Sequence, residues 1–260
     1  MKTAIIVPAR YASSRFPGKP LAELTGAKGD KKSLIQRSWE AAMAVGHGDV
    51  FVATDDTRIK DASEAFGADV VMTSESCRNG TERCADALRE LNTDYDLVVN
   101  LQGDAPLSPA WFINDMINYF EQGGLADMAT PVLRCSDETL KNLQADRKAG
   151  LVGGTTAVFN KDKRALYFSK EVLPFADQPK TPVYHHVGIY AYRPAALDAY
   201  LGWEECDLEK IEGLEQLRFL DNGAHVQCIE VEARGREFWE VNNPEDIDRV
   251  SAMLQKLGIE

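Results

Sequence analysis

An apolar, β-branched run at residues 3–7 ends directly in a loop of small and positively charged residues at 8–21. Such a run predicts a buried strand, and open α/β sheets bind ligands at the carboxyl ends of their parallel strands. Small loop residues let backbone N–H groups approach an anion, and Arg10, Arg15 and Lys19 add positive charge. We therefore expect an α/β fold with a polyphosphate site at its first strand; a solvated basic loop is the alternative.

This loop matches neither of the common phosphate-binding motifs. Gly18-Lys19 is followed by Pro20 rather than by Ser or Thr, so the Walker pattern fails. No Gly-x-Gly-x-x-Gly run opens the first predicted helix, which argues against a dinucleotide site.

The charge and cysteine content narrow the function classes further. A net charge of −12 over 260 residues argues against a general nucleic-acid surface, so cations gathered in one loop suit a local anion. The five cysteines are scattered without CxxC spacing, which argues against a disulfide framework or a zinc site. We find neither a membrane-span run nor a signal-peptide core, so we expect a cytoplasmic protein.

Strand-like and helix-like stretches alternate through the first half of the chain. Further strands are expected at 50–54, 70–72 and 97–101. Helices are expected from Ser33, near 58–66, from a Thr81 cap to 91, and after Ser108-Pro109. This alternation predicts a Rossmann-like, mostly parallel sheet with right-handed crossovers.

The pattern changes after Met128. Strands are expected at 128–133, 153–159 and 187–192 without long helices between them, then a helix over 208–220, a strand over 226–231 and a helix after Asn243-Pro244. We interpret 1–260 as a single domain in which 134–190 form an inserted mixed α/β subdomain, a candidate dimerisation arm.

Polar residues also stand where other predicted strands and helices begin or end. Asp104 follows the strand at 97–101 behind Gly103, which suits an oxygen-ligated Mg²⁺; a helix-capping turn is the alternative. Gln102 is expected to face the same crevice. Thr54 ends the second strand and is a further candidate site residue. An acidic turn without a binding role explains this part of the sequence equally well.

Two further clusters have weaker signals. Strand alternation places His186 and Tyr190 on one face and His185 on the other, so the paired histidines do not suit a shared zinc ion. The alternative to a ligand-binding role for these residues is a polar strand that is packed in the core. Glu215 lies beside the apolar stripe of the helix at 208–220, so its side chain can face inward. The alternative is that it belongs to a solvated acidic face of this helix.

Together these motifs resemble the sugar-acid cytidylyltransferase family, most closely its 3-deoxy-manno-octulosonate (Kdo) type. The resemblance is collinear through the chain and rests on the loop 8–21 and the segments 79–83, 102–106, 186–193, 208–218 and 242–246. It implies a nucleotidyltransferase (GT-A-like) fold that uses CTP and a 3-deoxy-2-ulosonic acid, most closely Kdo, to give a CMP-sugar and pyrophosphate. It also implies a Mg²⁺ cofactor, a homodimer, no nucleic-acid partner and no membrane insertion. For the inserted subdomain 134–190 it implies a role in sugar binding or dimerisation.

The resemblance also implies a role for individual residues. Catalytic roles are implied for Arg10, Lys19 and Asp104, and Mg²⁺ ligation for Asp104 and Asn242. The implied nucleotide-binding residues are Ala9, Arg10, Arg15, Lys19, Thr54, Gly80, Thr81, Arg83, Gln102 and Gly103. The implied sugar-binding residues are Gln102, Lys170, His186, Tyr190 and Glu215.

The chain departs from the family pattern at four places. Ala105 replaces a carboxylate, Asn242 replaces the metal-ligating aspartate, Lys170 replaces an arginine, and the segment 150–157 is unlike the family's. These departures concern the metal and the acceptor sugar rather than the nucleotide loop. The alternatives are therefore a cytidylyltransferase for another sugar acid and a weakly catalytic CTP-binding homologue.

Overall fold

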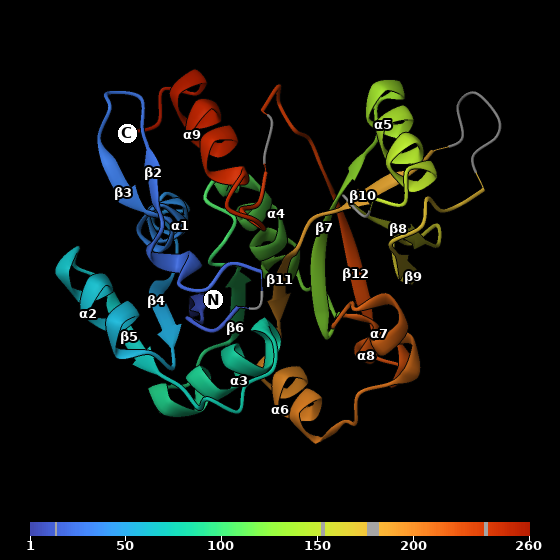
Figure 1. Cartoon of the computed structure of the whole chain (residues 1–260). Helices are drawn as coiled ribbons and strands as arrows, with labels where there is room; N and C mark the ends of the chain where they lie inside the picture. Colours follow the sequence, from blue (N-terminus) through green and yellow to red (C-terminus); the bar gives the residue numbers. More distant parts are fainter. Residues whose placement is uncertain (14, 152–153, 176–181, 237–238) are drawn as a thin grey trace. The chain divides into compact units, whose positions relative to one another are not determined.

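The computed structural model describes residues 1–13, 15–151, 154–175, 182–236 and 239–260 (Figure 1). It contains two compact units, Met1–Asn114 with Arg234–Glu260 and Asp115–Ala233. The single domain with an insertion at 134–190 stays a prediction, and residues 152 and 153 of the atypical segment lie outside the described residues.

A parallel sheet forms the centre of the first unit. Its strands follow the order β5 (Asp69–Met72), β4 (Asp49–Thr54), β1 (Thr3–Ala9) and β6 (Leu97–Leu101). Every residue of β1 and β6 is buried, as in strands covered on both faces, and all but Thr3 and Asn100 are apolar. The predicted parallel sheet is confirmed for this unit.

Helices connect the successive strands: α1 (Leu34–Met43), α2 (Thr57–Ala65) and α3 (Gly80–Leu91). Ser33 caps α1 as predicted, since its side chain accepts a hydrogen bond from the Gln36 N–H. The expected Thr81 cap is wrong: Asn79 is the N-cap of α3, and its Oδ1 accepts from the Glu82 N–H at 2.8 Å. Thr81 lies buried in the first turn instead.

The C-terminal segment completes the first unit. Helix α9 (Asp246–Lys256) packs on strand β2 (Glu23–Thr25), which pairs with β3 (Lys31–Ser33) in an antiparallel hairpin. A buried apolar cluster holds these parts together and includes Leu24, Leu34, Leu107, Val241, Val250 and Leu254. Val241 is fully buried there, so the chain just before α9 is fixed by the same core. Helix α4 (Ala110–Glu121) begins in the first unit and ends in the second.

Strand β7 (Met128–Arg134) is the centre of the second unit. It pairs antiparallel with β10 (Tyr184–His186) and β11 (Ile189–Tyr192), and parallel with β12 (Val226–Val231). Strands β8 (Thr155–Phe159) and β9 (Ala165–Ser169) extend the sheet from β10. Antiparallel and parallel strands therefore occur together in the sheet of this unit.

Three expectations for the second unit are wrong in detail. Helix α5 (Asp137–Lys148) occupies a stretch expected to lack long helices. Leu143 is its one buried residue, so the sequence carries almost no apolar stripe there. The helix expected at 208–220 is two, α7 (Asp207–Glu212) and α8 (Leu217–Asp221), because Gly213 adopts a left-handed φ of 61°. The strand expected at 187–192 begins only at Ile189.

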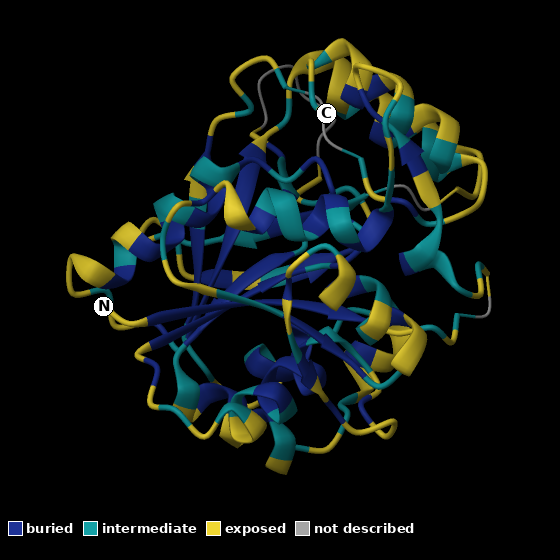
Figure 2. Ribbon diagram, turned by 90° about the vertical axis from the view of Figure 1, so that its left-hand side faces the viewer, coloured by how far each residue is buried: buried dark blue, intermediate teal, exposed yellow. Residues whose placement is uncertain are grey.

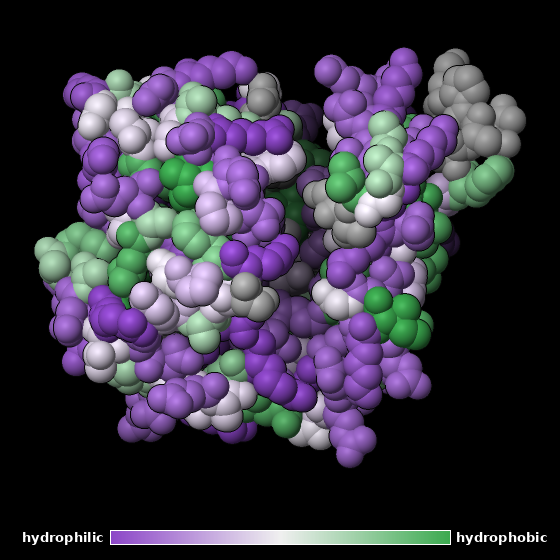
Figure 3. All heavy atoms as spheres, in the orientation of Figure 1, coloured by the Kyte–Doolittle hydropathy of each residue, from purple (hydrophilic) through white to green (hydrophobic). Residues whose placement is uncertain are grey.

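Burial follows the layers of the fold (Figure 2). The strands are mostly buried, whereas the helices expose residues along their outer sides. The face in Figure 3 is mostly hydrophilic. Among the described residues, no helix has both the length and the apolar character that a membrane crossing requires.

A buried ion pair joins the helices of the second unit. Arg218 on α8 donates through Nε and Nη2 to both carboxylate oxygens of Glu209 on α7, each at 2.7 Å. Its guanidinium lies 4.1 Å from the ring centroid of Tyr200 on α6 (Pro194–Gly202). Both charged side chains are buried, so each depends on the other for compensation.

We predict that Arg218→Met destabilises the protein by about 3–5 kcal/mol, because it leaves the Glu209 carboxylate buried without its partner. Urea unfolding followed by circular dichroism measures this. Replacing Glu209 by Leu in the same chain should recover most of the loss, since it removes the unpaired charge. A double variant as unstable as Arg218→Met would contradict this account.

Candidate functional site

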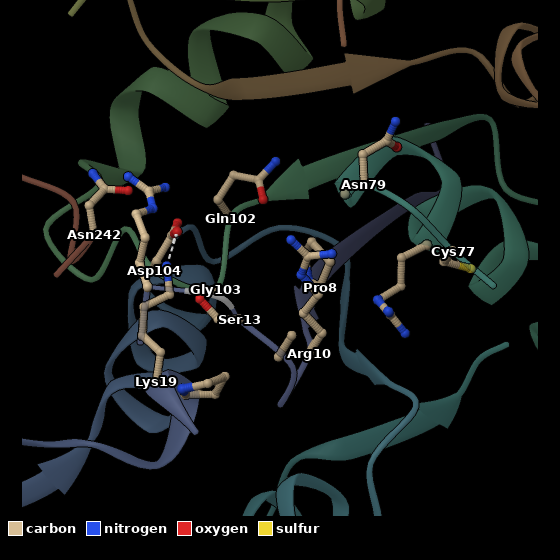
Figure 4. Close-up of a pocket in the computed structure, with 15 residues that line it drawn as sticks. Pro8, Arg10, Ser13, Lys19, Cys77, Asn79, Gln102, Gly103, Asp104 and Asn242 are labelled. Carbon is tan, nitrogen blue, oxygen red and sulfur yellow. Dashed lines mark hydrogen bonds and ion pairs between the residues drawn. The ribbon is translucent and has the colours of Figure 1, made fainter. Parts of the chain in front are cut away.

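A cavity of about 220 Å³ lies where β1 and β6 end in the first unit (Figure 4). The predicted residues that line it are Ala9, Arg10, Arg15, Lys19, Gly80, Arg83, Gln102, Gly103, Asp104 and Asn242. Pro8, Ser13, Pro20, Cys77 and Asn79 also line it. Thr54 and Thr81 do not line this cavity, and both are buried. The structure thus brings most of the predicted nucleotide and metal residues of this unit into one place.

The loop after β1 folds back on itself through Gly18. The Gly18 N–H donates to the Tyr11 carbonyl at 3.0 Å with φ at +72°, and a Cβ there would lie 3.1 Å from the Tyr11 ring. The Arg58 guanidinium covers that ring at 3.3 Å from its centroid. This closed loop leads directly into the short 3₁₀ helix η1 (Lys19–Leu21), which fixes the position of Lys19.

Gly103 lets the two strand ends approach closely. A Cβ at this position would lie only 2.6 Å from the Pro8 carbonyl oxygen of β1, so no larger residue fits without a backbone shift. The Ser38 hydroxyl of α1 donates to the Gly103 carbonyl at 3.0 Å and holds the turn. Asp104, the next residue, is therefore placed beside the first loop.

The start of α3 forms another wall of the cavity. A Cβ on Gly80 would lie 2.7 Å from Gln102 Nε2, so glycine leaves room for this amide. The N-terminus of the helix presents N–H groups and the positive end of its dipole. Arg83 is almost fully buried and donates to Asp55 Oδ2 at 3.1 Å and to Thr73 Oγ1 at 2.6 Å, so its charge is fixed in place.

The first loop and the C-terminal segment meet at Asp104. The Lys19 ammonium donates to Asp104 Oδ2 at 2.6 Å and to the Val241 carbonyl at 3.0 Å (Figure 4). The Val241 N–H in turn donates to the Asp104 carbonyl at 2.9 Å. These bonds hold Asn242 at the cavity wall, although it is far from Asp104 in sequence.

Glu240 belongs to the same charged group and was missed by the sequence analysis. Desolvation and the neighbouring Asp104 carboxylate raise the pKa of Glu240 to about 7, opposed by the Lys19 ammonium and by a hydrogen bond with the Asn242 side chain. No local sequence pattern signals this, because the Glu240 segment meets Asp104 through the long-range backbone bond from the Val241 N–H.

Positive charge dominates the cavity. Of the residues that the structure describes, four cations line it, namely Arg10, Arg15, Lys19 and Arg83, against the carboxylate of Asp104. Arg10 and Arg15 are exposed, and Arg10 Nη1 donates to the Arg78 carbonyl at a long 3.4 Å. Backbone donors at a helix start together with several cations form a site for a polyphosphate.

The donor set also fits a magnesium ion. Asp104 and Asn242 line the same cavity and offer carboxylate and amide oxygens, the ligands that this ion takes in proteins. The described residues contain no group of three His, Cys, Asp or Glu side chains placed to hold a metal ion. Mg²⁺ does not need one, since it keeps waters and uses substrate phosphates as ligands.

Two predicted sugar residues lie together in the second unit. The rings of His186 and Tyr190 have centroids 5.7 Å apart, although the strand is interrupted between them. The Thr130 hydroxyl lies 2.9 Å from His186 Nε2 and donates to the Val187 or Ile189 carbonyl. Because a hydroxyl has one proton to donate, His186 donates from Nε2 and is the Nε2–H tautomer.

The other predicted sugar residues of this unit lie near α7. The Lys170 N–H donates to Glu212 Oε2 at 2.9 Å, and its ammonium lies 2.9 Å from where a Gly213 Cβ would be. Glu215 follows α7, and its carbonyl accepts from the Tyr200 hydroxyl at 3.5 Å. The sequence analysis missed Glu212, which also accepts from the Ser169 hydroxyl at 2.7 Å and so fixes Lys170 at the end of β9.

Desolvation keeps both histidines of β10 neutral, although His186 is buried and His185 only half-buried. Desolvation lowers the pKa of His185 to about 4 and that of His186 to about 3, with a smaller contribution from His185 to the latter. At neutral pH these imidazoles therefore act as hydrogen-bonding groups rather than cations.

Comparison with known proteins finds similar sequences along the whole chain. A family model described as "Cytidylyltransferase" matches residues 4–230. The chain is 44% identical over 261 residues to a 3-deoxy-manno-octulosonate cytidylyltransferase of Maricaulis maris, covering 99% of each chain. It is 42% identical over 258 residues to an 8-amino-3,8-dideoxy-manno-octulosonate cytidylyltransferase of Shewanella pealeana, covering 98% of this chain and 99% of the relative.

A solved structure shows the same fold. The structure of a CMP:2-keto-3-deoxy-manno-octonic acid synthetase complexed with CTP matches with a TM-score of 0.85 and 32% identity, covering 99% of this chain and all of the other. The predicted nucleotidyltransferase-like α/β fold is confirmed by this match.

We predict that Gly103→Ala destabilises the protein by about 1–3 kcal/mol, because the methyl group forces the β6 loop away from Pro8. It should also weaken CTP binding, since Asp104 moves with the loop. Chemical unfolding and calorimetric titration measure the two effects. Gly202→Ala is the matched control: a Cβ there meets nothing within 4 Å, so both values should stay unchanged or stability should rise slightly. Equal behaviour of the two variants would contradict the close approach.

The buried histidines predict a pH dependence. The unfolded chain takes up protons below the ordinary histidine pKa of 6.5, whereas the folded chain does so only near 4 and 3. The free energy of unfolding should therefore fall as the pH drops from 6.5 towards 5, each histidine contributing up to about 1.4 kcal/mol per pH unit. His185→Gln should flatten this slope in urea unfolding at several pH values; an unchanged slope would contradict the prediction.

Proposed function

Because the chain belongs to the cytidylyltransferase family, we propose that it transfers CMP from CTP to 3-deoxy-manno-octulosonate (Kdo) and releases pyrophosphate. One observation carries the proposal: the loop cations and Asp104 meet in a single cavity at the ends of β1 and β6. A polyphosphate and a cation-dependent transfer both suit that arrangement.

The proposed reaction exchanges one phosphorus–oxygen bond for another. The anomeric hydroxyl oxygen of the sugar acid bonds to the α-phosphorus, and the bond from this phosphorus to the bridging oxygen of the β-phosphate breaks. The hydroxyl proton leaves to solvent, and the electron pair departs with pyrophosphate. Such a transfer depends mainly on positioning and on neutralising the charge of the leaving group.

The residues of the first unit supply that neutralisation. Arg10, Arg15 and Lys19 would hold the β- and γ-phosphates, and the α3 start at Gly80 would offer backbone donors. Arg83 would hold the nucleotide with a guanidinium that Asp55 and Thr73 already fix. Thr54 and Thr81 would support the cavity wall rather than contact the nucleotide with their side chains, since both are buried and neither lines the cavity.

Asp104 and Asn242 would hold the magnesium ion. When bound, Mg²⁺ supplies charge neutralisation for the phosphates and lowers the pKa of a coordinated hydroxyl. Asn242 offers a neutral oxygen, so it contributes less to cation affinity than a carboxylate would.

The resemblance implies sugar-binding roles for Gln102 in the first unit and for four residues in the second. His186 in its neutral Nε2–H form and Tyr190 would orient sugar hydroxyls, and Glu215 would accept from others. Lys170 would pair with the sugar carboxylate as a point charge rather than as a bidentate fork. A homodimer in the cytoplasm stays part of the proposal.

An amino analogue of the same acid is the second candidate acceptor. The relative from Shewanella pealeana named for it is nearly as similar to this chain as the Kdo relative. The departures from the family pattern also concern acceptor and metal residues, namely Lys170 and Asn242. A weakly catalytic CTP-binding homologue is the remaining alternative.

We predict pyrophosphate release from CTP and Mg²⁺ when Kdo is present, and none without an acceptor. A coupled phosphate assay with Kdo, 8-amino-3,8-dideoxy-manno-octulosonate and a sialic acid measures this. Release only with the amino sugar would reassign the acceptor. CTP binding without release from any of them would favour the non-catalytic alternative, and Lys19→Met, which should abolish most release, is the control for an active-site reaction.

A further inference from the structure

We infer that Asn100 is a positioning residue that turns the Gln102 amide toward a bound nucleotide. The inference deepens the proposed function and rests on it, because Gln102 lines the cavity that would hold CTP. It assigns a role to a fully buried side chain of β6 that does not itself line the cavity.

Asn100 is the polar exception in β6. The other residues of this strand are apolar, and all of them, Asn100 included, are fully buried. In the part of the chain that the structure describes, neither Nδ2 nor Oδ1 of Asn100 has a hydrogen-bond partner. A buried amide without a partner destabilises the folded chain, so its presence indicates that it is paired in another state of the protein.

The Asn100 amide packs on the first residue of α3, beside Gln102. Asn100 Nδ2 lies 3.2 Å from where a Cβ of Gly80 would be. Gln102 Nε2 and Oε1 lie 2.7 and 3.0 Å from the same point. Asn100 and Gln102 are two residues apart at the end of a strand, so their side chains leave the backbone on the same side. Glycine at position 80 leaves room for both amides.

The amide nitrogens of both residues therefore lie against Gly80 in the free chain, and two N–H donors cannot bond to each other. A half-turn of the Gln102 amide about its last side-chain bond exchanges its nitrogen and its oxygen. Gln102 Oε1 can then accept a hydrogen bond from Asn100 Nδ2, and Gln102 Nε2 turns toward the cavity. The turned state pairs the buried Asn100 donor and presents two N–H donors to a ligand.

A nucleotide supplies the atoms that favour the turned state. Gln102 lines the same cavity as Arg10, Arg15 and Lys19, which suits an anion rich in oxygen (Figure 4). Phosphate and ribose oxygens accept hydrogen bonds, so they attract the Gln102 nitrogen rather than its oxygen. Nucleotide binding therefore pairs two donors in one step, Gln102 Nε2 with the ligand and Asn100 Nδ2 with Gln102.

The test separates positioning from packing, because the unpaired amide lowers the stability of the free chain but supports nucleotide binding. Asn100→Leu replaces the amide by an apolar group of similar size, so the free energy of unfolding in urea should stay equal or rise. The affinity for CTP, measured by calorimetry without an acceptor sugar, should fall about fivefold, since Gln102 loses the hydrogen bond that orients it.

Two further variants complete the design. Thr3→Val is the matched control on the neighbouring strand β1: it removes a buried hydroxyl that also has no partner among the described residues, and CTP affinity should stay unchanged. Gln102→Met should weaken CTP binding about tenfold. Adding Asn100→Leu to Gln102→Met should cause no further loss, because Asn100 acts through Gln102.

One measurement uses the unmodified chain. The side-chain amide protons of Asn100 should shift downfield in NMR spectra when CTP is added, because one of them gains a hydrogen bond to Gln102 Oε1. The same protons in the Gln102→Met chain should not shift in this way.

Unchanged CTP affinity in Asn100→Leu would overturn the role of Asn100, as would a further loss in the Gln102→Met background. If Asn100→Leu does not fold, the NMR comparison decides, and unshifted Asn100 protons in the unmodified chain overturn the inference. No CTP binding by the unmodified chain would overturn the proposed function itself. Because no acceptor sugar is present, a wrong assignment of the acceptor leaves this test unaffected.

Discussion

The parallel pairing of β1 with both β4 and β6 is the constraint on which the site depends. It aligns Ala9 with Thr54 and Ile6 with Asn100, so the loops that follow these strands begin at one edge of the sheet. Gly103 then allows the β6 loop to touch Pro8. The cavity lies at this edge, and its cations come from loops and a helix start that the sheet alone brings together.

Most of this arrangement could be predicted from the sequence, because strand ends and glycine-containing helix starts leave local signals. Ala9 and Asp104 are predicted from the apolar strands that precede them, whereas Gly80 is predicted from the family resemblance. Thr54 was placed correctly at a strand end, yet its side chain is buried and accepts from the Asp56 N–H at 3.2 Å. Strand-end position alone does not show which way a side chain points.

What could not be predicted depends on long-range contacts or on weak local patterns. Glu240 reaches the site through the bond between Val241 and Asp104, which no local pattern shows. Helix α5 was missed because its stability does not come from a broad apolar face. The single helix expected at 208–220 includes Gly213, whose left-handed conformation ends α7.

The ion pair between Lys19 and Asp104 has a consequence for how strongly ligands depend on salt. In the free chain this ammonium already has a carboxylate partner at 2.6 Å. A triphosphate that enters the cavity exchanges one anion for another around Lys19 rather than neutralising a bare charge. The ionic-strength dependence of its binding should therefore reflect mainly Arg10 and Arg15, the exposed cations. The salt dependence of triphosphate binding therefore indicates fewer cations than actually line the cavity.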